Sequence, residues 1–180
     1  MTSREQVSGN EDIAKAYLTI AQQYHQKDDT ANEIATLQAA REKCLPTDSG
    51  GEIRYKLGSA LYSQGQSDKA LNAFQQMADT TPESPYAPSA LYFIGTYATG
   101  DDAVKALRQL SVGPADRKWK GLAYAQLAKL TKATDIALAR DYYLSAIEMF
   151  NEYSASNPNQ PLIEAKIQTI NAELALLDKR

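Results

Sequence analysis

Apolar positions recur at three- and four-residue steps along most of the chain. The first such stretch contains Ile13, Tyr17, Ile20, Ala21 and Tyr24. This spacing places apolar side chains on one face of an α-helix. The alternation of β-branched and polar residues that is typical of strands is nearly absent from the sequence. The chain is therefore predicted to be all-α.

Segments rich in Gly, Pro, Asp and Asn interrupt the helical pattern at regular intervals. They leave apolar stretches of roughly 11 to 18 residues, a usual length for helices in globular proteins. Pairing consecutive stretches predicts four helical hairpins and one final helix. The hairpins are expected at about 11–46, 51–84, 86–112 and 118–156, and the final helix at 161–179. Residues 1–10 are predicted to form a disordered N-terminal segment.

A longer repeat is superimposed on the helical one. A branched apolar residue precedes a very small one at Ile20-Ala21, Leu57-Gly58 and Ile94-Gly95, and successive pairs lie 37 residues apart. Equal spacing at this scale is typical of stacked helical hairpins. One hairpin cannot cover its own apolar face, so such units stack on their neighbours.

The central unit carries the fullest pattern. Leu57-Gly58 is followed by Ala70 and Phe74 at a four-residue step, and then by Pro82. The unit resembles the tetratricopeptide (TPR) repeat family, whose helix–turn–helix repeat of about 34 residues has this order of residues. Physically, Gly58 is small because two helices must cross closely there, and Phe74 fills the space between them.

The resemblance implies a right-handed α-solenoid of about four TPR-like hairpins over residues 11–180. The final helix would then act as a cap, with one face on the last hairpin and the other in water. Arg54 and Leu61 depart from the pattern, because the family usually has Trp and Tyr at these positions. Within the hairpins, Ser67 and Asp101 are expected to be helix N-caps.

In such arrays the first helix of each hairpin lines a concave surface. Tyrosines and small polar side chains give large contact area at low entropy cost, so this surface suits a peptide or a protein loop. The alternative is that the tyrosines only pack between neighbouring repeats. Counting by repeat register gives these candidate partner-binding residues: Lys15, Leu18, Gln22, His25, Glu52, Tyr55, Ser59, Tyr62, Ser89, Tyr92, Thr96, Thr99, Lys129 and Lys132.

The predicted function is a protein–protein interaction scaffold that binds a protein or peptide partner on this face. The alternative is a structural subunit whose helical array mediates self-association as a homo-oligomer, with no separate ligand. Leu18 and Gln22 occupy positions where some family members have a clamp for a carboxyl terminus, so that clamp is expected to be missing.

The junction at residues 81–92 resembles that of bacterial periplasmic members of the family, which implies a role in the cell envelope. The sequence from Met1 has no apolar core of the kind that an export signal contains. We therefore expect a periplasmic or envelope-associated protein if an export segment has been trimmed, and a cytoplasmic protein otherwise.

Charge argues against nucleic acid as a partner. The chain has 19 Lys and Arg residues against 22 Asp and Glu residues, a net charge of −3, and its basic residues are scattered. No run of 18 or more apolar residues occurs, so no transmembrane segment is expected.

Candidate catalytic chemistry is sparse. His25, close to Asp28, has the chemistry of a general base, but no nucleophile or second histidine accompanies it, so a polar helix-end residue is the preferred interpretation. His25 and Cys44 are the only residues of their types and together are too few for a zinc site. Cys44 is expected to be a small buried residue. No enzyme activity, metal or cofactor is predicted.

Overall fold

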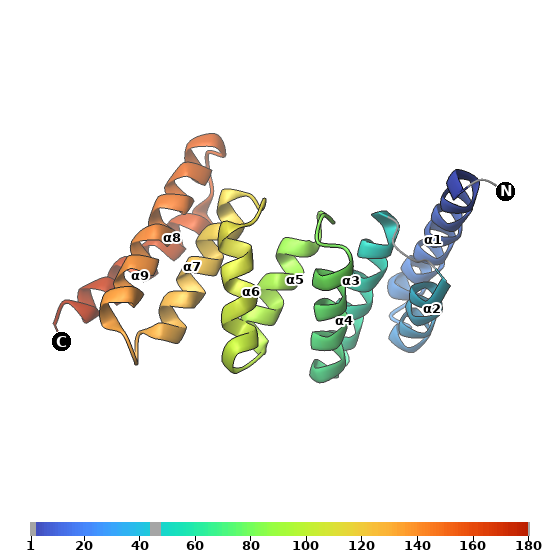
Figure 1. The fold of residues 1–180 in the computed structure, drawn as a ribbon, viewed down its shortest axis with the longest axis horizontal. Coiled ribbons are helices and arrows are strands. Elements are labelled where there is room, and N and C mark those ends of the chain that lie inside the picture. The colour runs from blue at the N-terminus through green and yellow to red at the C-terminus, as the bar shows by residue number, and fades with distance from the viewer. Residues whose placement is uncertain (1–2, 44–47, 180) are drawn as a thin grey trace. The chain divides into compact units, whose positions relative to one another are not determined.

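The computed structural model describes residues 3–43 and 48–179 (Figure 1). Every regular element in these ranges is an α-helix, which confirms the all-α prediction. The helices are α1 (Ser3–Gln26), α2 (Thr30–Lys43), α3 (Asp48–Ser63), α4 (Ser67–Thr80), α5 (Ala87–Tyr97), α6 (Gly100–Val112), α7 (Arg117–Thr131), α8 (Ile136–Ser156) and α9 (Pro161–Leu177).

The first helix begins earlier than the sequence pattern predicts. Helix α1 starts at Ser3, so residues 3–10 are helical rather than disordered. No proline or glycine precedes Gly9, and one glycine within a helix costs only about 1 kcal/mol relative to alanine. The helix can therefore begin before the stretch that its apolar pattern marks. The expected burial of Cys44 lies outside the described residues.

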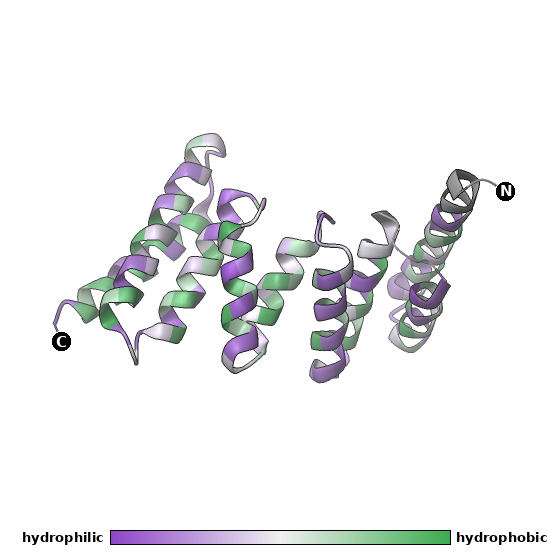
Figure 2. Ribbon diagram, in the orientation of Figure 1, coloured by the Kyte–Doolittle hydropathy of each residue, from purple (hydrophilic) through white to green (hydrophobic). Residues whose placement is uncertain are grey.

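The chain divides into two compact units, Met1–Ala90 (unit 1) and Leu91–Arg180 (unit 2), with the division inside α5. In unit 1, α1 packs on α2, and α3 contacts α1, α2 and α4. In unit 2, α7 packs against α6 and α8, and α9 against α8. Figure 2 shows hydrophilic and hydrophobic residues interleaved along α3 and α4, as expected for helices with one buried face.

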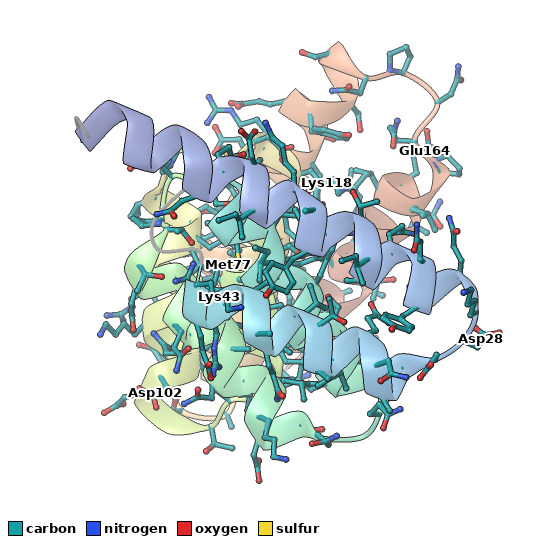
Figure 3. The ribbon with its side chains drawn as sticks, turned by 90° about the vertical axis from the view of Figure 1, so that its right-hand side faces the viewer. Asp28, Lys43, Met77, Asp102, Lys118 and Glu164 are labelled. Atoms are coloured by element: carbon teal, nitrogen blue, oxygen red, sulfur yellow. The ribbon has the colours of Figure 1, made fainter. Side chains whose placement is uncertain are left out.

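Two tight turns confirm predicted breakers. Asp28, seen at the end of α1 in Figure 3, has a φ of 55°. Gly65 has a φ of 74° and connects α3 to α4. Backbone in this left-handed region is most favourable for glycine and is tolerated by aspartate, so these residues allow the chain to reverse in a short turn.

The two predicted N-caps are wrong. Helix α4 begins at Ser67 itself, so the cap position belongs to Gln66. In α6 the cap position is Thr99, and Asp101 lies in the first turn together with Asp102. These carboxylates act on the positive end of the helix dipole instead of capping a single N–H group.

The predicted close crossing of helices in the central hairpin is confirmed. A Cβ built on Gly58 would lie 2.8 Å from the ring of Phe74, so no larger residue fits without movement. The same arrangement recurs between α5 and α6, where a Cβ on Gly95 would lie 2.3 Å from Leu107. The small residue of the Leu57-Gly58 and Ile94-Gly95 pairs therefore lies where a second helix approaches closely.

Helix α9 covers the end of the α7–α8 hairpin. Ile163, Ile170 and Leu177 are buried in a cluster with residues of α7 and α8. The sequence pattern predicts an apolar stripe of Leu162, Ala165, Ile167, Ile170, Leu174 and Leu177, without Ile163. Leu162 and Ala165 of this stripe are exposed, with Leu162 at 79%. Adjacent helical residues point about 100° apart, so Leu162 cannot face the core beside Ile163.

Candidate partner-binding surface

Unit 1 contains a groove of about 540 Å³ between α1 and α3. We call it the α1–α3 groove. One wall comes from the second half of α1 and the other from the first half of α3. Its lining residues are Lys15, Leu18, Thr19, Gln22, Gln23, Gln26, Ser49, Glu52 and Lys56.

Several predicted partner-binding residues meet in this groove. Lys15, Leu18 and Gln22 come from the first predicted hairpin and Glu52 from the second. The remaining lining residues were missed, because the repeat register assigns one narrow row of positions to each first helix. A groove between two helices takes side chains from the neighbouring rows as well.

The groove has charged edges and an amide-rich wall. Lys15 Nζ lies 3.7 Å from Glu11 Oε1, and Lys56 Nζ lies 3.7 Å from Glu52 Oε1. Both ion pairs join residues one turn apart in the same helix. The hydroxyl of Ser49 on α3 donates to the Glu11 carboxylate on α1, so one contact crosses between the walls. Leu18 adds a half-buried apolar surface. Glutamine side chains can donate to and accept from a peptide backbone.

Tyr55 belongs to an aromatic cluster beside Phe74 and Tyr86. Its ring centroid lies 4.9 Å from that of Tyr86 in a stacked arrangement, and 5.9 Å from that of Phe74. The hydroxyl of Ser89 donates to the Tyr55 hydroxyl over 3.3 Å. Burial of Tyr86, followed by the charge of Glu52, raises the pKa of the Tyr86 phenol. The packing alternative thus describes Tyr55 well, since its ring contacts Phe74 of α4 and Tyr86 in the turn before α5.

The other unit 1 candidates lie in separate surroundings. His25 Nδ1 lies 3.1 Å from Oε2 of Glu33, whose side chain is buried on α2. His25 is not among the residues that line the groove. Ser59 donates its hydroxyl to the carbonyl of Tyr55, and Tyr62 is 39% exposed.

In unit 2 the candidates come from α5, α7 and their ends. The ring centroid of Tyr92 lies 5.9 Å from that of Trp119, and the hydroxyl of Thr96 donates to the Tyr92 carbonyl. Thr99 is exposed at the start of α6. Lys129 is exposed, whereas Lys132 Nζ lies 3.0 Å from Glu173 Oε2 on α9. Lys132 is thus held within the chain.

No group of three or more His, Cys, Asp or Glu side chains in the described part of the chain could hold a metal ion. No helix within residues 3–43 and 48–179 has both the length and the apolar character to cross a membrane.

No protein-family model matches this chain, and no curated protein sequence is significantly similar to it.

Proposed function

We propose that this protein is an interaction scaffold built from TPR-like hairpins, and that the α1–α3 groove holds an extended peptide or protein segment. The observation that carries the proposal is the groove itself: four residues assigned to the partner surface from sequence register line one open space. They come from the first helices of two successive hairpins.

The chemistry of the walls favours a peptide over a small apolar ligand. An extended peptide exposes an N–H and a carbonyl at each residue, and both need partners when they leave water. Gln22, Gln23 and Gln26 offer amide donors and acceptors along one wall. Lys15 and Lys56 each lie beside a glutamate of the same helix, so the groove offers both signs of charge to the polar groups of a bound segment.

The assignment of TPR-like repeats rests on one contact that occurs in two successive hairpins. Glycine lies beneath a large side chain at both Gly58–Phe74 and Gly95–Leu107. This recurrence supports a stacked array, with α9 as its cap. The junction at 81–92 resembles that of bacterial periplasmic TPR proteins, which supports a place in a bacterial envelope complex. Protease accessibility in intact and permeabilised cells of the native organism tests that placement.

The binding proposal is tested by selecting peptides from a random phage-displayed library on the wild-type protein. Dissociation constants of the selected peptides are then measured by isothermal titration calorimetry. Gln22→Arg fills the groove from an exposed position of α1, and we expect it to weaken binding at least about tenfold, or about 1.4 kcal/mol.

Gln75→Arg is the matched control, because Gln75 is an exposed glutamine on α4 outside the groove. It should leave the dissociation constant within about twofold, since rim charges far from a site act weakly. The proposal fails if no peptide is enriched, or if the two variants bind the selected peptides alike.

A further inference from the structure

Arg54 of α3 is a buried cation in unit 1. The residue is only 6% exposed, whereas arginine is rarely buried in proteins unless an acid pairs with it. Its Nη1 atom donates to the carbonyl of Gly50, one turn earlier in the same helix, over 3.0 Å. The ion pairs among the described residues of unit 1 are Lys15–Glu11, His25–Glu33 and Lys56–Glu52. No described carboxylate therefore pairs with Arg54.

A second guanidinium lies near the first. Arg41 is half-buried in the last turn of α2, which packs on α3. Burial, followed by the charge of Arg41, lowers the pKa of the Arg54 guanidinium. Within the described residues, no carboxylate pairs with Arg41 either. Two like charges in a partly buried place raise the energy of the folded chain unless an anion offsets them.

Arg41 also lines a groove of about 420 Å³ between α2 and α4, which we call the α2–α4 groove. Its lining residues are Gln38, Arg41, Leu57, Leu61, Asp68, Lys69 and Asn72. Arg54 precedes Leu57 by one turn, so it lies on the face of α3 that forms the floor of this groove.

Both guanidiniums belong to the same end of the α2–α4 groove. Helix α2 ends at Lys43 and α3 begins at Asp48, so the last turn of α2 lies near the start of α3. Asp68, the acid among the lining residues, is in the first turn of α4, which follows the other end of α3. The end that contains Arg41 and Arg54 is therefore positively charged.

The helix dipole accounts for only part of this arrangement. The negative end of the α2 dipole favours a cation such as Arg41. Figure 3 shows Lys43 at the same end of α2, but its Nζ lies 5.6 Å from the centroid of the Tyr17 ring on α1. A guanidinium has five N–H donors, and the described bond of Arg54 to Gly50 uses one nitrogen. Donors thus remain for a ligand.

We propose that Arg41 and Arg54 bind a small oxyanion where α2 and α3 meet, at one end of the α2–α4 groove. A guanidinium presents parallel N–H groups that match the oxygen atoms of a carboxylate or a phosphate. The small exposure of Arg54 limits the ligand to a free anion or to a charged group on a narrow stem. The site is separate from the α1–α3 groove, because the two grooves have no lining residue in common.

Thermal unfolding of the full chain, followed by circular dichroism, tests the site. Chloride is replaced stepwise by phosphate or by acetate at constant ionic strength. A bound anion raises the melting temperature in a saturable manner, which gives an apparent dissociation constant. Phosphate also stabilises proteins because it is excluded from their surface, so each response is compared with that of variants in the same salts.

Arg41→Gln should weaken oxyanion binding at least about tenfold, because it removes one of the two guanidiniums. Arg54→Met should remove the saturable shift as well, and Arg41→Gln decides the test if Arg54→Met does not fold. Lys69→Gln is the matched control. It removes a positive charge from the same groove, where Lys69 Nζ donates to Gln66 Oε1 over 2.8 Å, and should change the apparent dissociation constant by less than about twofold.

The two probe anions distinguish the source of the ligand. A saturable response to phosphate alone supports a phosphate group, and a response to acetate supports a carboxylate group. Equal shifts in the wild-type protein and in Arg41→Gln overturn the proposal. Equal weakening by Arg41→Gln and Lys69→Gln also overturns it, because the anions would then respond to the general charge of the groove.

Discussion

The α3–α4 hairpin of unit 1 and the α7–α8 hairpin of unit 2 each place a glycine beneath a phenylalanine. A Cβ on Gly58 would lie 2.8 Å from Phe74, and one on Gly121 would lie 2.6 Å from Phe150. The hairpins differ in what surrounds that contact. Helix α4 ends after 14 residues, whereas α8 continues for 21 and also supports α9.

The extra length of α8 adds a second buried layer. Ala139-x-x-x-Tyr143 imitates Ala70-x-x-x-Phe74 in sequence, but Tyr143 does not lie over the glycine. It is fully buried in a cluster with residues of α9, and Phe150, two turns later, fills the close crossing. The comparison teaches that a close helix crossing can be conserved in geometry while the repeat pattern shifts around it.

The largest expected effect comes from removing the two rings. Phe74→Ala and Phe150→Ala should each lower the free energy of unfolding by about 3–5 kcal/mol, because each leaves a cavity in a close helix crossing. That is a large part of a typical total of about 5–15 kcal/mol. Chemical denaturation monitored by circular dichroism measures the loss.

Native-state amide hydrogen exchange then shows which helices each substitution destabilises. Phe74→Ala should reduce amide protection first in α3 and α4, and Phe150→Ala first in α7 and α8. A shift of the melting temperature of less than a few degrees for either variant would contradict the packing role of its ring.

The two hairpins also differ in how much the sequence predicts. Gly58–Phe74 is predictable because Leu57-Gly58, Ala70 and Pro82 form a recognisable pattern. Gly121 lies outside the 37-residue spacing. Tyr143 occupies the aromatic position of the Ala-x-x-x-Phe pattern, although the ring that packs on Gly121 is that of Phe150. The sequence therefore predicts the fourth hairpin but does not predict the Gly121–Phe150 contact at its centre. Local periodicity identifies helices, but the residue that fills a crossing depends on how two helices are offset.

The candidate site also contains some residues that helical periodicity predicts and others that depend on how the helices pack. Lys15, Leu18 and Gln22 were predictable from helical register in α1, and all three line the groove. Ser49 and Lys56 were missed because their place depends on how α3 lies against α1. That arrangement is a tertiary property, and no short pattern in the sequence records it.

An intermediate effect is expected from filling the space beneath each ring. Gly58→Ala and Gly121→Ala should each be net destabilising by about 0–2 kcal/mol. The added methyl group costs about 1–3 kcal/mol by overpacking. Alanine returns about 1 kcal/mol, because it favours the helix over glycine. Thermal and chemical denaturation measure the balance.

A double-mutant cycle separates the clash from the helix preference. Combining Gly58→Ala with Phe74→Leu should cost less than the sum of the single changes, by at least about 0.5 kcal/mol, since a smaller side chain admits the new methyl group. The pair Gly121→Ala and Phe150→Leu should behave in the same way. Strict additivity in either hairpin would show that the glycine there is not held by the ring above it.

The smallest effect concerns Tyr143, which has no counterpart in the α3–α4 hairpin. Its buried hydroxyl has no hydrogen-bond partner of ordinary length and angle among the described residues, although the carboxylate of Glu173 lies near enough to act on it. Burial, followed by the charge of Glu173, raises the pKa of Tyr143 to about 12. Tyr143→Phe removes an unsatisfied polar group, so it should leave stability unchanged or raise it by about 1 kcal/mol or less at neutral pH.

The same substitution should change the dependence of stability on pH. An unfolded tyrosine ionises near pH 10, whereas Tyr143 in the folded protein keeps its proton until about pH 12. The unfolded state thus binds fewer protons in this window, and the contribution of Tyr143 to stability falls as pH rises through it. Tyr143→Phe should therefore lose less stability between pH 10 and 12 than wild type. Tyr142→Phe, a half-buried neighbour on α8, is the control. If both variants follow the wild-type curve, Tyr143 is not held neutral by burial beneath α9, and the second layer of the α7–α8 hairpin is more open than its packing indicates.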